Sequence, residues 1–456
     1  MKRLRAMLCA LLAGVLLAGC AVQPRTDDKQ GGGAAVDLTK YAAREAAYPA
    51  YPHEPRYEDY FDENGEGDWD AYMAAEDEYM AAMQKLGKGR LDQESAAPVL
   101  AFADRTAGAI FADSENRVYS PISLYAALAM LTEVTDGSTK RQVMDLLAIG
   151  DTETLRRQIR DLWIGVYTDD DQSVCRLANG AFLRENAEVK QEAVDTLADW
   201  HFASTYRVPM GTEEADKAIA GWLNQNTGGL LSEETGNIRT DGNDLLRLYN
   251  TIYYKSGWQD AFKSSQTKQD TFTAADGSAQ TVDFMHRTES GGYRKGEGYT
   301  AASRSLNYGR MVFVLPDEGV TPESLLQRQG FLAELTGDYN AAELVWSVPK
   351  FDVKSSTELN EVLQTLGVTD AFDMTKADFA PLTANGAFLS SAMQAARVKI
   401  DEEGVEAAAY TELVCADSAM MEVPPTVEMD LDRPFLFVIF DYNNIPLFVG
   451  TVNALN

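Results

Sequence analysis

The side chains of this sequence that could carry out catalysis are few and scattered. Its three histidines are His53, His201 and His286, and none of them stands in the two-histidine helical pair that binds zinc. The sequence contains no phosphate-binding loop, nucleophile elbow or dinucleotide fingerprint, since the Gly-Glu-Gly at 296–298 is too short to count. A dispersed Ser/His/Asp arrangement stays open and would make the chain a hydrolase. We expect no catalytic residue, no metal site and no cofactor.

The residues that favour another kind of chemistry form one stretch near the C-terminus, DEEGVEAAAYTELVC at 401–415. It runs from acidic residues through Gly404 into small and strand-compatible residues, and Pro424-Pro425 soon follows, which cannot continue a central strand. In an extended conformation its side chains alternate between two faces. The small or apolar face holds Val405, Ala407, Ala409, Thr411, Leu413 and Cys415, and the other face holds Glu406, Ala408, Tyr410, Glu412 and Val414.

This alternation is what a strand inserted into a packed sheet requires, because a charge on its inward face would be buried without a partner. An ordinary two-sided surface strand alternates as well and is the alternative. Gly404 favours insertion because glycine supplies a pivot, and the alanines at 407–409 meet little resistance on entering a sheet. We therefore predict an exposed loop that can become an additional strand.

The composition limits the classes of partner. The chain has 456 residues, of which 45% are hydrophobic, and this is enough for a large buried core. Its formal net charge is −30, and no basic stripe offsets the acidic surface. We therefore exclude nucleic acid and anionic lipid surfaces as partners.

Residues 1–19 are predicted to be an export signal. Three basic residues at 2, 3 and 5 precede an apolar run over 6–18 that is too short to span a membrane. The run closes on Leu17-Ala18-Gly19-Cys20, which resembles the lipobox of bacterial lipoproteins. That resemblance implies that Cys20 is lipid-modified and anchors the exported chain to the bacterial cell envelope, outside the cytoplasm. An ordinary cleavage site with an incidental cysteine is the alternative.

Residues 20–92 are predicted to be a flexible tether followed by a spacer. The tether contains Gly31-Gly32-Gly33, and residues 41–80 carry seven of the chain's 20 tyrosines and twelve acidic side chains against two arginines. We expect an acidic, partly disordered spacer, and a docking segment for an outside partner is the alternative. No linker-like stretch follows, so residues 93–456 are expected to form one domain.

Helical patterns dominate the first half of this domain and strand patterns the second, which predicts an α+β fold. A helix is expected to begin at Ser120-Pro121 and to end at Asp136-Gly137-Ser138, with a second helix from about Thr139. Strands are expected in LYNTIYYKSG at 248–257 and RMVFVLP at 310–316, and two more strands are expected to join at Asn443-Asn444.

Several further motifs are informative when taken together and in order. They are Ser120-Pro121-Ile122-Ser123 with Ala127-Leu128-Ala129-Met130; Asn250 before Ile252-Tyr253-Tyr254-Lys255 and Gly257-Trp258; Leu315-Pro316-Asp317; VPKFDVKSSTELNEVLQTLGVTDAFD at 348–373; the acidic hinge around Gly404; and Arg433-Pro434-Phe435-Leu436-Phe437. This series resembles the serpin family of protease inhibitors. The resemblance implies a serpin fold of helices and three β-sheets, with an exposed reactive-centre loop near the C-terminus.

In that family, a protease cuts the loop and is still joined to it as an acyl-enzyme when the loop enters the sheet, which distorts the protease. Family spacing from Gly404 places the cut bond at Ser418-Ala419, whereas counting back from Pro424-Pro425 places it at Met421-Glu422. Neither Ser418 nor Met421 is basic, so a trypsin-like target is disfavoured, and other serine proteases or a cysteine protease are expected.

The resemblance also assigns roles to individual residues. Gln394 stands where many members have histidine, which puts a histidine-centred network in doubt, although an amide can also donate and accept. Trp258 is interpreted either as core packing or as a gate. The hinge is expected to be Glu402, Glu403, Gly404, Val405, Glu406, Ala407, Ala408 and Ala409; the shutter beneath the sheet is expected to be Ser120, Pro121, Ser123, Asn250 and Gln394; and Lys350 is expected to pair with Glu402 at the root of the loop.

The expected function is inhibition of a protease by a monomeric, envelope-tethered chain that supplies no catalytic residue. The alternative is a non-inhibitory member of the family, a binding module whose loop never inserts. Apart from Cys20, the mature chain holds two cysteines, Cys175 and Cys415, which we expect to be small buried hydrophobes rather than a disulfide.

Overall fold

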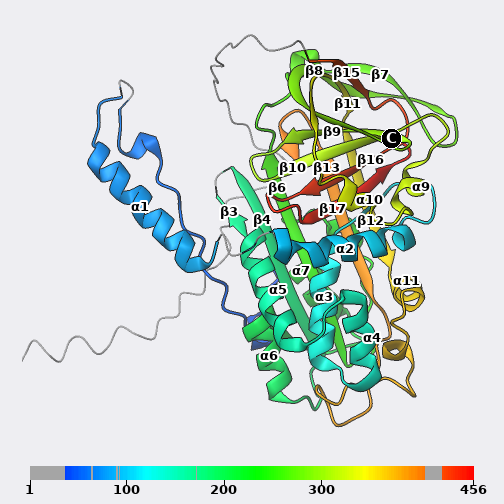
Figure 1. Ribbon diagram of the computed structural model, residues 1–456. Helices are drawn as coiled ribbons and strands as arrows, with labels where there is room; N and C mark the ends of the chain where they lie inside the picture. Colours follow the sequence, from blue (N-terminus) through cyan, green and yellow to red (C-terminus); the bar gives the residue numbers. More distant parts are fainter. Residues whose placement is uncertain are drawn as a thin grey trace, which may run out of the picture.

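The computed structural model describes residues 36–62, 65–88, 91, 93–170, 172–405 and 424–455. Most helices pack in the half of the molecule opposite the second of two β-sheets, and long strands of the first sheet run between the two halves (Figure 1). Within these ranges, no helix is both long and apolar enough to cross a lipid bilayer. The expected α+β class is confirmed.

The helices form where the sequence combines an apolar face with a good cap. The helix predicted after Ser120-Pro121 is α3, where the Ser120 side chain accepts a hydrogen bond from Ser123 N and Pro121 fills the first helical position. The next helix begins two residues before Thr139, because Asp136 caps it. The α-helices are α1 (Trp69–Leu86), α2 (Gln93–Ile110), α3 (Pro121–Val134), α4 (Gly137–Leu147), α5 (Thr152–Val166), α6 (Gln191–His201), α7 (Glu213–Asn226), α8 (Ser232–Thr235), α9 (Pro322–Leu326), α10 (Phe331–Glu334) and α11 (Asn360–Thr365). The 3-10 helices are η1 (Thr39–Tyr41), η2 (Tyr57–Asp59), η3 (Ser264–Gln266) and η4 (Asp370–Phe372).

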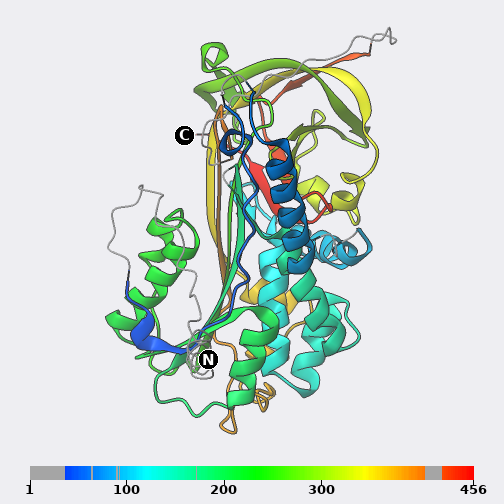
Figure 2. The ribbon, with the colours of Figure 1, turned by 90° about the vertical axis from the view of Figure 1, so that its left-hand side faces the viewer.

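The first sheet, here called the main sheet, has eight strands in the order β1-β5-β4-β6-β14-β13-β12, with β3 paired to β4. Its strands are β1 (Ala42–Arg44), β3 (Thr168–Asp169), β4 (Ser173–Arg184), β5 (Ala203–Val208), β6 (Leu246–Gly257), β12 (Phe351–Glu358), β13 (Met393–Ile400) and β14 (Gly404–Val405). Helices cover both of its faces (Figure 2). Helix α3 packs on one face, and α7 buries Trp222 and Ile219 against β4 and β5 on the other.

The second sheet has nine strands in the order β15-β11-β8-β9-β10-β16-β17-β2, with β7 paired to β8. Its strands are β2 (Arg117–Tyr119), β7 (Lys268–Thr273), β8 (Ala279–Gly296), β9 (Tyr299–Ser305), β10 (Arg310–Pro316), β11 (Asn340–Pro349), β15 (Thr426–Asp430), β16 (Phe435–Phe440) and β17 (Pro446–Val452). Every residue of β16 and β17 is buried, which explains their continuous apolar sequence.

The described residues therefore form two hydrogen-bonded sheets, where three were expected. Strand β8 is 18 residues long. It pairs with β7 and β11 along most of its length and with β9 at its end, so that it joins two groups of strands into one sheet.

We expected residues 41–80 to be a partly disordered spacer, but the structure places β1, η2 and most of α1 in this range. Strand β1 adds to the edge of the main sheet beside β5, and the Tyr48 ring stacks on Trp163 and Phe202. Farther along, α1 begins at the cap of Asp68, whose side chain accepts a hydrogen bond from Ala71 N at 2.9 Å. The aromatic residues that set this segment apart in the sequence are those that anchor it.

Candidate functional site: the loop root and the divided sheet

The first residues of the predicted hinge already lie in the main sheet. Strand β14 pairs with β6 on one side, where Gly404 faces Gly257 and Val405 faces Ser256. On its other side Val405 faces Ile400 of β13. Val405 is 3% exposed, so its side chain points into the core. The chain therefore enters the sheet between two strands and leaves the described region immediately afterwards.

Gly404 is needed for this entry because the backbone approaches β6 closely. A Cβ atom at this position would meet the carbonyl oxygen of Ser256 and lie 2.7 Å from the Cα of Gly257. Both contacts are with backbone atoms, which cannot move aside cheaply. The glycine identified as a pivot in the sequence is therefore also the residue that lets β14 fit between its neighbours.

Trp258 holds the turn that leads into β14. Its backbone N–H donates to the carbonyl oxygen of Glu403 at 2.9 Å, and its indole N–H donates to the carbonyl oxygen of Asp401 at 3.0 Å. The side chain is also buried, with 4% exposed. Of the two interpretations of Trp258, core packing describes its ring, and its two donated hydrogen bonds fix the root of the loop.

Glu402 lies in a polar contact on the other side of this turn. Its carboxylate accepts a hydrogen bond from Thr267 Oγ1 at 2.7 Å and lies 3.0 Å from Lys350 Nζ. Burial acts to raise the pKa of this carboxyl group, but the hydrogen bonds from Thr267 and Lys350 outweigh it, so the pKa of Glu402 is lowered. The pairing of Lys350 with Glu402 is as predicted, whereas Thr267 was not identified from the sequence.

Beyond β14 the main sheet is divided. In the described part of the chain no register joins β6 to β13 directly, and β14 is the element that pairs with both. A cavity of about 310 Å³ lies along this division. Its lining includes Ser123, Leu124 and Leu128 of α3, Leu248 and Asn250 of β6, and Gln394 of β13. We call this division the slot.

The predicted shutter residues lie beside the slot and form two separate arms. On the β13 side, the amide of Gln394 accepts a hydrogen bond from Ser120 N at 3.0 Å and donates one to Ser120 O at 3.0 Å. Gln394 therefore uses both halves of its amide to hold the start of α3. An amide can make both contacts because it carries a donor and an acceptor.

The second arm begins on β6. Ser123 Oγ donates to the side chain of Asn250, whose amide in turn donates to Asn179 of β4. Asn179 donates to the backbone carbonyl of His201 at the end of α6. The five predicted shutter residues are thus brought together around the first turn of α3, and Asn179 and His201 extend the group.

His201 belongs to a buried ion-pair cluster behind this arm. Its Nε2 atom lies 3.1 Å from Glu133 Oε1, and the guanidinium of Arg156 contacts the same carboxylate at 2.7 Å. Burial acts to raise the pKa of Glu133, but His201 and Arg156 outweigh it and lower the pKa to about 2. The cluster fixes α3, α5 and α6 to one another behind the slot.

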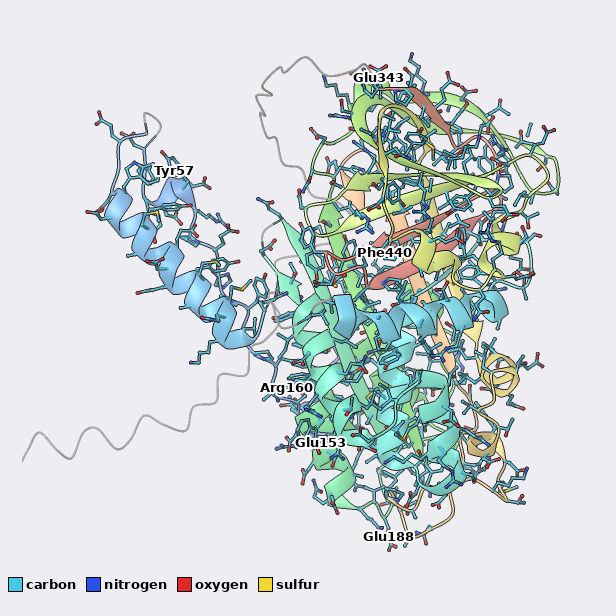
Figure 3. All side chains as sticks on the ribbon, in the orientation of Figure 1. Tyr57, Glu153, Arg160, Glu188, Glu343 and Phe440 are labelled. Carbon is cyan, nitrogen blue, oxygen red and sulfur yellow. The ribbon has the colours of Figure 1, made fainter. Side chains whose placement is uncertain are left out.

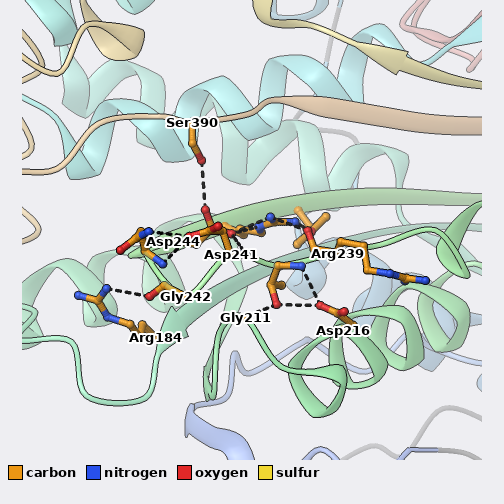
Figure 4. Close-up of polar contacts among 12 residues, drawn as sticks. Arg184, Gly211, Asp216, Arg239, Asp241, Gly242, Asp244 and Ser390 are labelled. Atoms are coloured by element: carbon orange, nitrogen blue, oxygen red, sulfur yellow. Dashed lines mark hydrogen bonds and ion pairs between the residues drawn. The ribbon is translucent and has the colours of Figure 1, made fainter.

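A small polar network closes the foot of the slot (Figure 4). Ser390, which precedes β13, donates a hydrogen bond to Asp244, which precedes β6, at 3.2 Å. Asp244 also accepts from the backbone N–H of Asp241, and Thr240 binds Asp216 of α7. This link spans the two strands that border the slot, and nothing in the sequence indicated it.

The remaining predicted residues of the reactive loop lie outside the described residues. These are Glu406, Ala407, Ala408, Ala409, Ser418, Ala419, Met421 and Glu422, and Cys20 and Cys415 also lie outside. Cys175 is buried with a free thiol, as expected for a small hydrophobe, and burial raises the pKa of that thiol.

The residues missed by the sequence analysis have partners far away along the chain. Thr267 is 135 residues from Glu402, Asn179 is 71 residues from Asn250, and Asp244 is 146 residues from Ser390. Threonine, asparagine and serine are common on any surface, so their types carry no signal without the fold. The buried position of Asn179 within an apolar strand is the one local feature that could have singled it out.

The whole domain is similar to known proteins. The family described as Serpin (serine protease inhibitor) matches residues 100–455. Alpha-1-antiproteinase 2 of Equus caballus is 27% identical over 352 residues, which cover 75% of this chain and 82% of that protein. Serpin-Z1C of Triticum aestivum is 28% identical over 361 residues, covering 74% and 90% of the two chains.

Solved structures give the same result. The native state of the thermophilic serpin tengpin has a TM-score of 0.70 and 26% identity, covering 78% of this chain and 94% of that chain. Human thyroxine-binding globulin in complex with its ligand has a TM-score of 0.67 at 20% identity, covering 78% and 100%, which shows the shared fold. Serpins are generally protease inhibitors. This chain, with its loop root seated in a divided main sheet, belongs to the serpin family.

Proposed function

We propose that this chain inhibits a protease by trapping it, with the cut loop entering the slot between β6 and β13 as a new strand. The observation that carries the proposal is the position of β14 at one end of the slot, where Gly404 and Val405 pair with β6 and Val405 also pairs with β13. The strand that would complete the sheet is the continuation of β14 along the chain.

The register of β14 supports this proposal. Every second residue of β13 is buried, and Val405 faces the buried residues Ile400 and Ser256. If the same antiparallel register continued, the inward set of the loop would be its small or apolar set. Ala407 would face Tyr254 and Val398, Ala409 would face Ile252 and Ala396, and Thr411 would face Asn250 and Gln394. The one hydroxyl of the set would thus meet the two amides of the shutter.

The free energy available is large enough to act on a protease. About ten new backbone hydrogen bonds at roughly 0.5–1.5 kcal/mol each give on the order of 10 kcal/mol before entropy is subtracted. This is comparable to the whole stability of a domain, at about 5–15 kcal/mol. The uncut fold would therefore be metastable. Cleavage of the loop would allow the new strand to form and would release this free energy.

The protease supplies the chemistry. Its serine or cysteine nucleophile attacks the carbonyl carbon of Ser418, the peptide bond to Ala419 breaks, and the new amine leaves with a proton. The product is an acyl-enzyme whose hydrolysis fails once insertion distorts the catalytic site. Cleavage between Met421 and Glu422 is the second assignment of the bond. The chain itself contributes no catalytic group.

We place this inhibitor outside the cytoplasm, anchored to the bacterial envelope through lipid on Cys20 and acting as a monomer. The lipobox-like end of the signal, Leu17-Ala18-Gly19-Cys20, supports this location. Mass spectrometry of the N-terminal peptide from the native host tests it, because a diacylglycerol on Cys20 adds a defined mass. An unmodified peptide that begins elsewhere would contradict the anchor.

The decisive experiment incubates the protein with a panel of serine and cysteine proteases. We expect an adduct that survives denaturing electrophoresis, together with a released C-terminal peptide whose mass fixes the bond. Ala409→Arg places a charge on the inward face of the inserting strand, so this variant should be cut without forming the adduct. Ala408→Arg, one residue away on the outward face, should retain it. Equal behaviour of the two variants would contradict insertion in this register.

A non-inhibitory serpin that acts as a binding module is the second candidate. Thyroxine-binding globulin, whose structure is similar, binds a ligand, although at 20% identity the similarity concerns the fold alone. Thermal unfolding separates the two functions. An inhibitory loop should raise the midpoint strongly after cleavage, since the new strand stabilises the sheet, whereas a loop that stays outside should leave the midpoint nearly unchanged.

A further inference from the structure

Helix α1 projects from the body of the molecule (Figure 1). None of its residues is buried, and its C-terminal end meets the body where Lys88 Nζ donates to the carbonyl oxygen of Gly165 at 2.9 Å. The helix precedes residue 100, where the match to the serpin family begins. It is therefore an addition to the inhibitor domain, and neither the slot nor the loop explains it.

Tyr57 lies at the end of α1 that points away from the body (Figure 3), and it belongs to a cluster of aromatic rings there. Tyr57 stacks on Phe61 with ring centroids 4.1 Å apart, and Trp69 meets Phe61 edge to face at 4.7 Å. Tyr72 lies 6.0 Å from Trp69 in a similar arrangement. Rings held in this way lose little conformational freedom when a partner covers them, which favours their use as anchors.

An apolar stripe continues from this cluster along the outer face of α1. Trp69, Met73 and Met80 are 56%, 53% and 61% exposed. At 100° per residue these three positions fall within about 40° of one another around the helix. Nine large hydrophobic side chains are exposed among the described residues, and four of them, Tyr57, Trp69, Met73 and Met80, lie on α1 or in the aromatic cluster at its start. The exposed apolar surface is therefore concentrated on this helix and the segment before it.

The same segment is strongly acidic. Residues 54–78 contain eleven acidic side chains and one arginine. Asp70 and Asp77, which flank the apolar stripe, form no ion pair with any residue that the structure describes. The pKa of Glu54 is raised by burial and by the neighbouring carboxylates of Glu76 and Asp170, a sign of crowded negative charge.

We propose that the outer face of α1, defined by Trp69, Met73 and Met80 with Asp70 and Asp77 beside them, docks a basic amphipathic segment of a partner protein. The apolar side chains of the partner would cover the stripe, and its lysine or arginine side chains would pair with the carboxylates. A second copy of the chain fits poorly, because each copy would bring the same excess of negative charge to the interface.

A labelled synthetic helix tests this proposal with the full chain. The probe is an 18-residue peptide with leucine along one face and lysine elsewhere, and its binding is followed by fluorescence anisotropy at 50 and 200 mM salt. We expect binding that weakens as salt rises. A peptide with glutamate in place of lysine should not bind, and an oligolysine without leucine should bind at least tenfold more weakly.

Matched variants locate the contact. The triple change Trp69→Ala, Met73→Ala and Met80→Ala should weaken binding of the Leu/Lys peptide at least tenfold, while leaving the thermal midpoint of the inhibitor domain unchanged. Met374→Ala removes another exposed methionine, 74% exposed and outside α1, and should have no effect. Equal binding by these two proteins would overturn the proposal. Self-association of the wild-type chain that the triple variant abolishes would also overturn it, because the stripe would then bind a second copy.

Discussion

The side-chain amide of Gln394 satisfies two buried backbone groups at once, the N–H and the carbonyl oxygen of Ser120. Both groups lie where α3 begins, immediately beneath the slot, and Ser120 is 1% exposed. Gln394 therefore fixes β13 to the start of α3 and also lines the slot.

The substitution Gln394→Met keeps the length of the side chain but removes both hydrogen bonds. We expect it to lower the free energy of unfolding by about 1–3 kcal/mol, because buried polar groups lose their partners. Urea unfolding measures this change. Gln364→Met, at an exposed position on α11, is the matched control and should change stability by about 0.5 kcal/mol or less. Equal losses in the two variants would show that the amide of Gln394 contributes nothing specific.

Glu402 gives a pH-dependent contribution to stability. Because its pKa in the folded protein is lowered below the unfolded value of about 4.3, its ion pair stabilises the fold above that pH. The contribution is lost as the pH falls through the folded pKa. Lys350 is 37% exposed at its side chain, so solvent screening limits the effect to about 1 kcal/mol or less.

Glu402→Gln should therefore lower the melting temperature slightly at pH 7, and the difference from wild type should shrink at pH 3. Differential scanning calorimetry at the two pH values measures it. The adjacent Glu403→Gln, at an exposed position, should show no difference at either pH. A deficit in Glu402→Gln that persists undiminished at pH 3 would mean that the ion pair is not its cause.

Among the elements, β1 carries the clearest consequence for stability. It extends the main sheet at the edge beyond β5, and the Tyr48 ring that follows it lies 5.5 Å from Trp163 and 6.4 Å from Phe202. Tyr41 is buried beside it and donates a hydrogen bond to Glu214 at 2.6 Å. The segment before the family match is thus part of the folded body.

Tyr48→Ala should lower the free energy of unfolding by about 1–3 kcal/mol, since two aromatic contacts and buried area are lost. Chemical denaturation followed by tryptophan fluorescence is suitable, because Trp163 reports on the site. Tyr60→Ala is the control, as its ring contacts Tyr72 of the projecting α1. If Tyr60→Ala destabilised the body as much as Tyr48→Ala, the stacking on Trp163 would not be the anchor.

The elements that the sequence predicted are those with strong local patterns. Helix α3 has a serine cap and a proline at its first position, and β6, β10, β16 and β17 are rich in β-branched and aromatic residues. Strand β1 has the sequence Ala-Ala-Arg, which has no strand preference, and it forms because β5 offers a free edge. The joining of two groups of strands by β8 is likewise a property of the assembled fold.

On the scale of the whole molecule, the net charge of −30 opposes compaction. Raising the salt concentration from 0.01 to 0.15 M shortens the Debye length from about 30 to about 8 Å and screens this repulsion. We expect the melting temperature at pH 7.5 to rise over that range. The rise should be much smaller at pH 5, nearer the isoelectric point of about 4.4. A melting temperature that does not change with salt at pH 7.5 would show that repulsion is not limiting.

The candidate site was predictable only in part at this scale. The alternation after Gly404 and the family resemblance predicted which segment is able to enter a sheet and which residues lie beneath that sheet. That β14 is already seated, and that the foot of the slot is closed by Asp244 and Ser390, depends on contacts between distant parts of the chain. The distance between two strands that only folding brings together cannot be deduced from a single sequence.

The length of β6 limits how many residues of the loop can pair with it. Val405 and Gly404 face the last two of its 12 residues, so ten residues of the loop, 406–415, would fill the rest. A cut after Ser418 would leave three residues hanging past Leu246, and a cut after Met421 would leave six. At about 3.3 Å per residue, the trapped protease would lie roughly 10 Å beyond the end of β6 after a cut at Ser418, and roughly 20 Å beyond it after a cut at Met421. The distance between a dye on the enzyme and one at this end would therefore report which bond was cut.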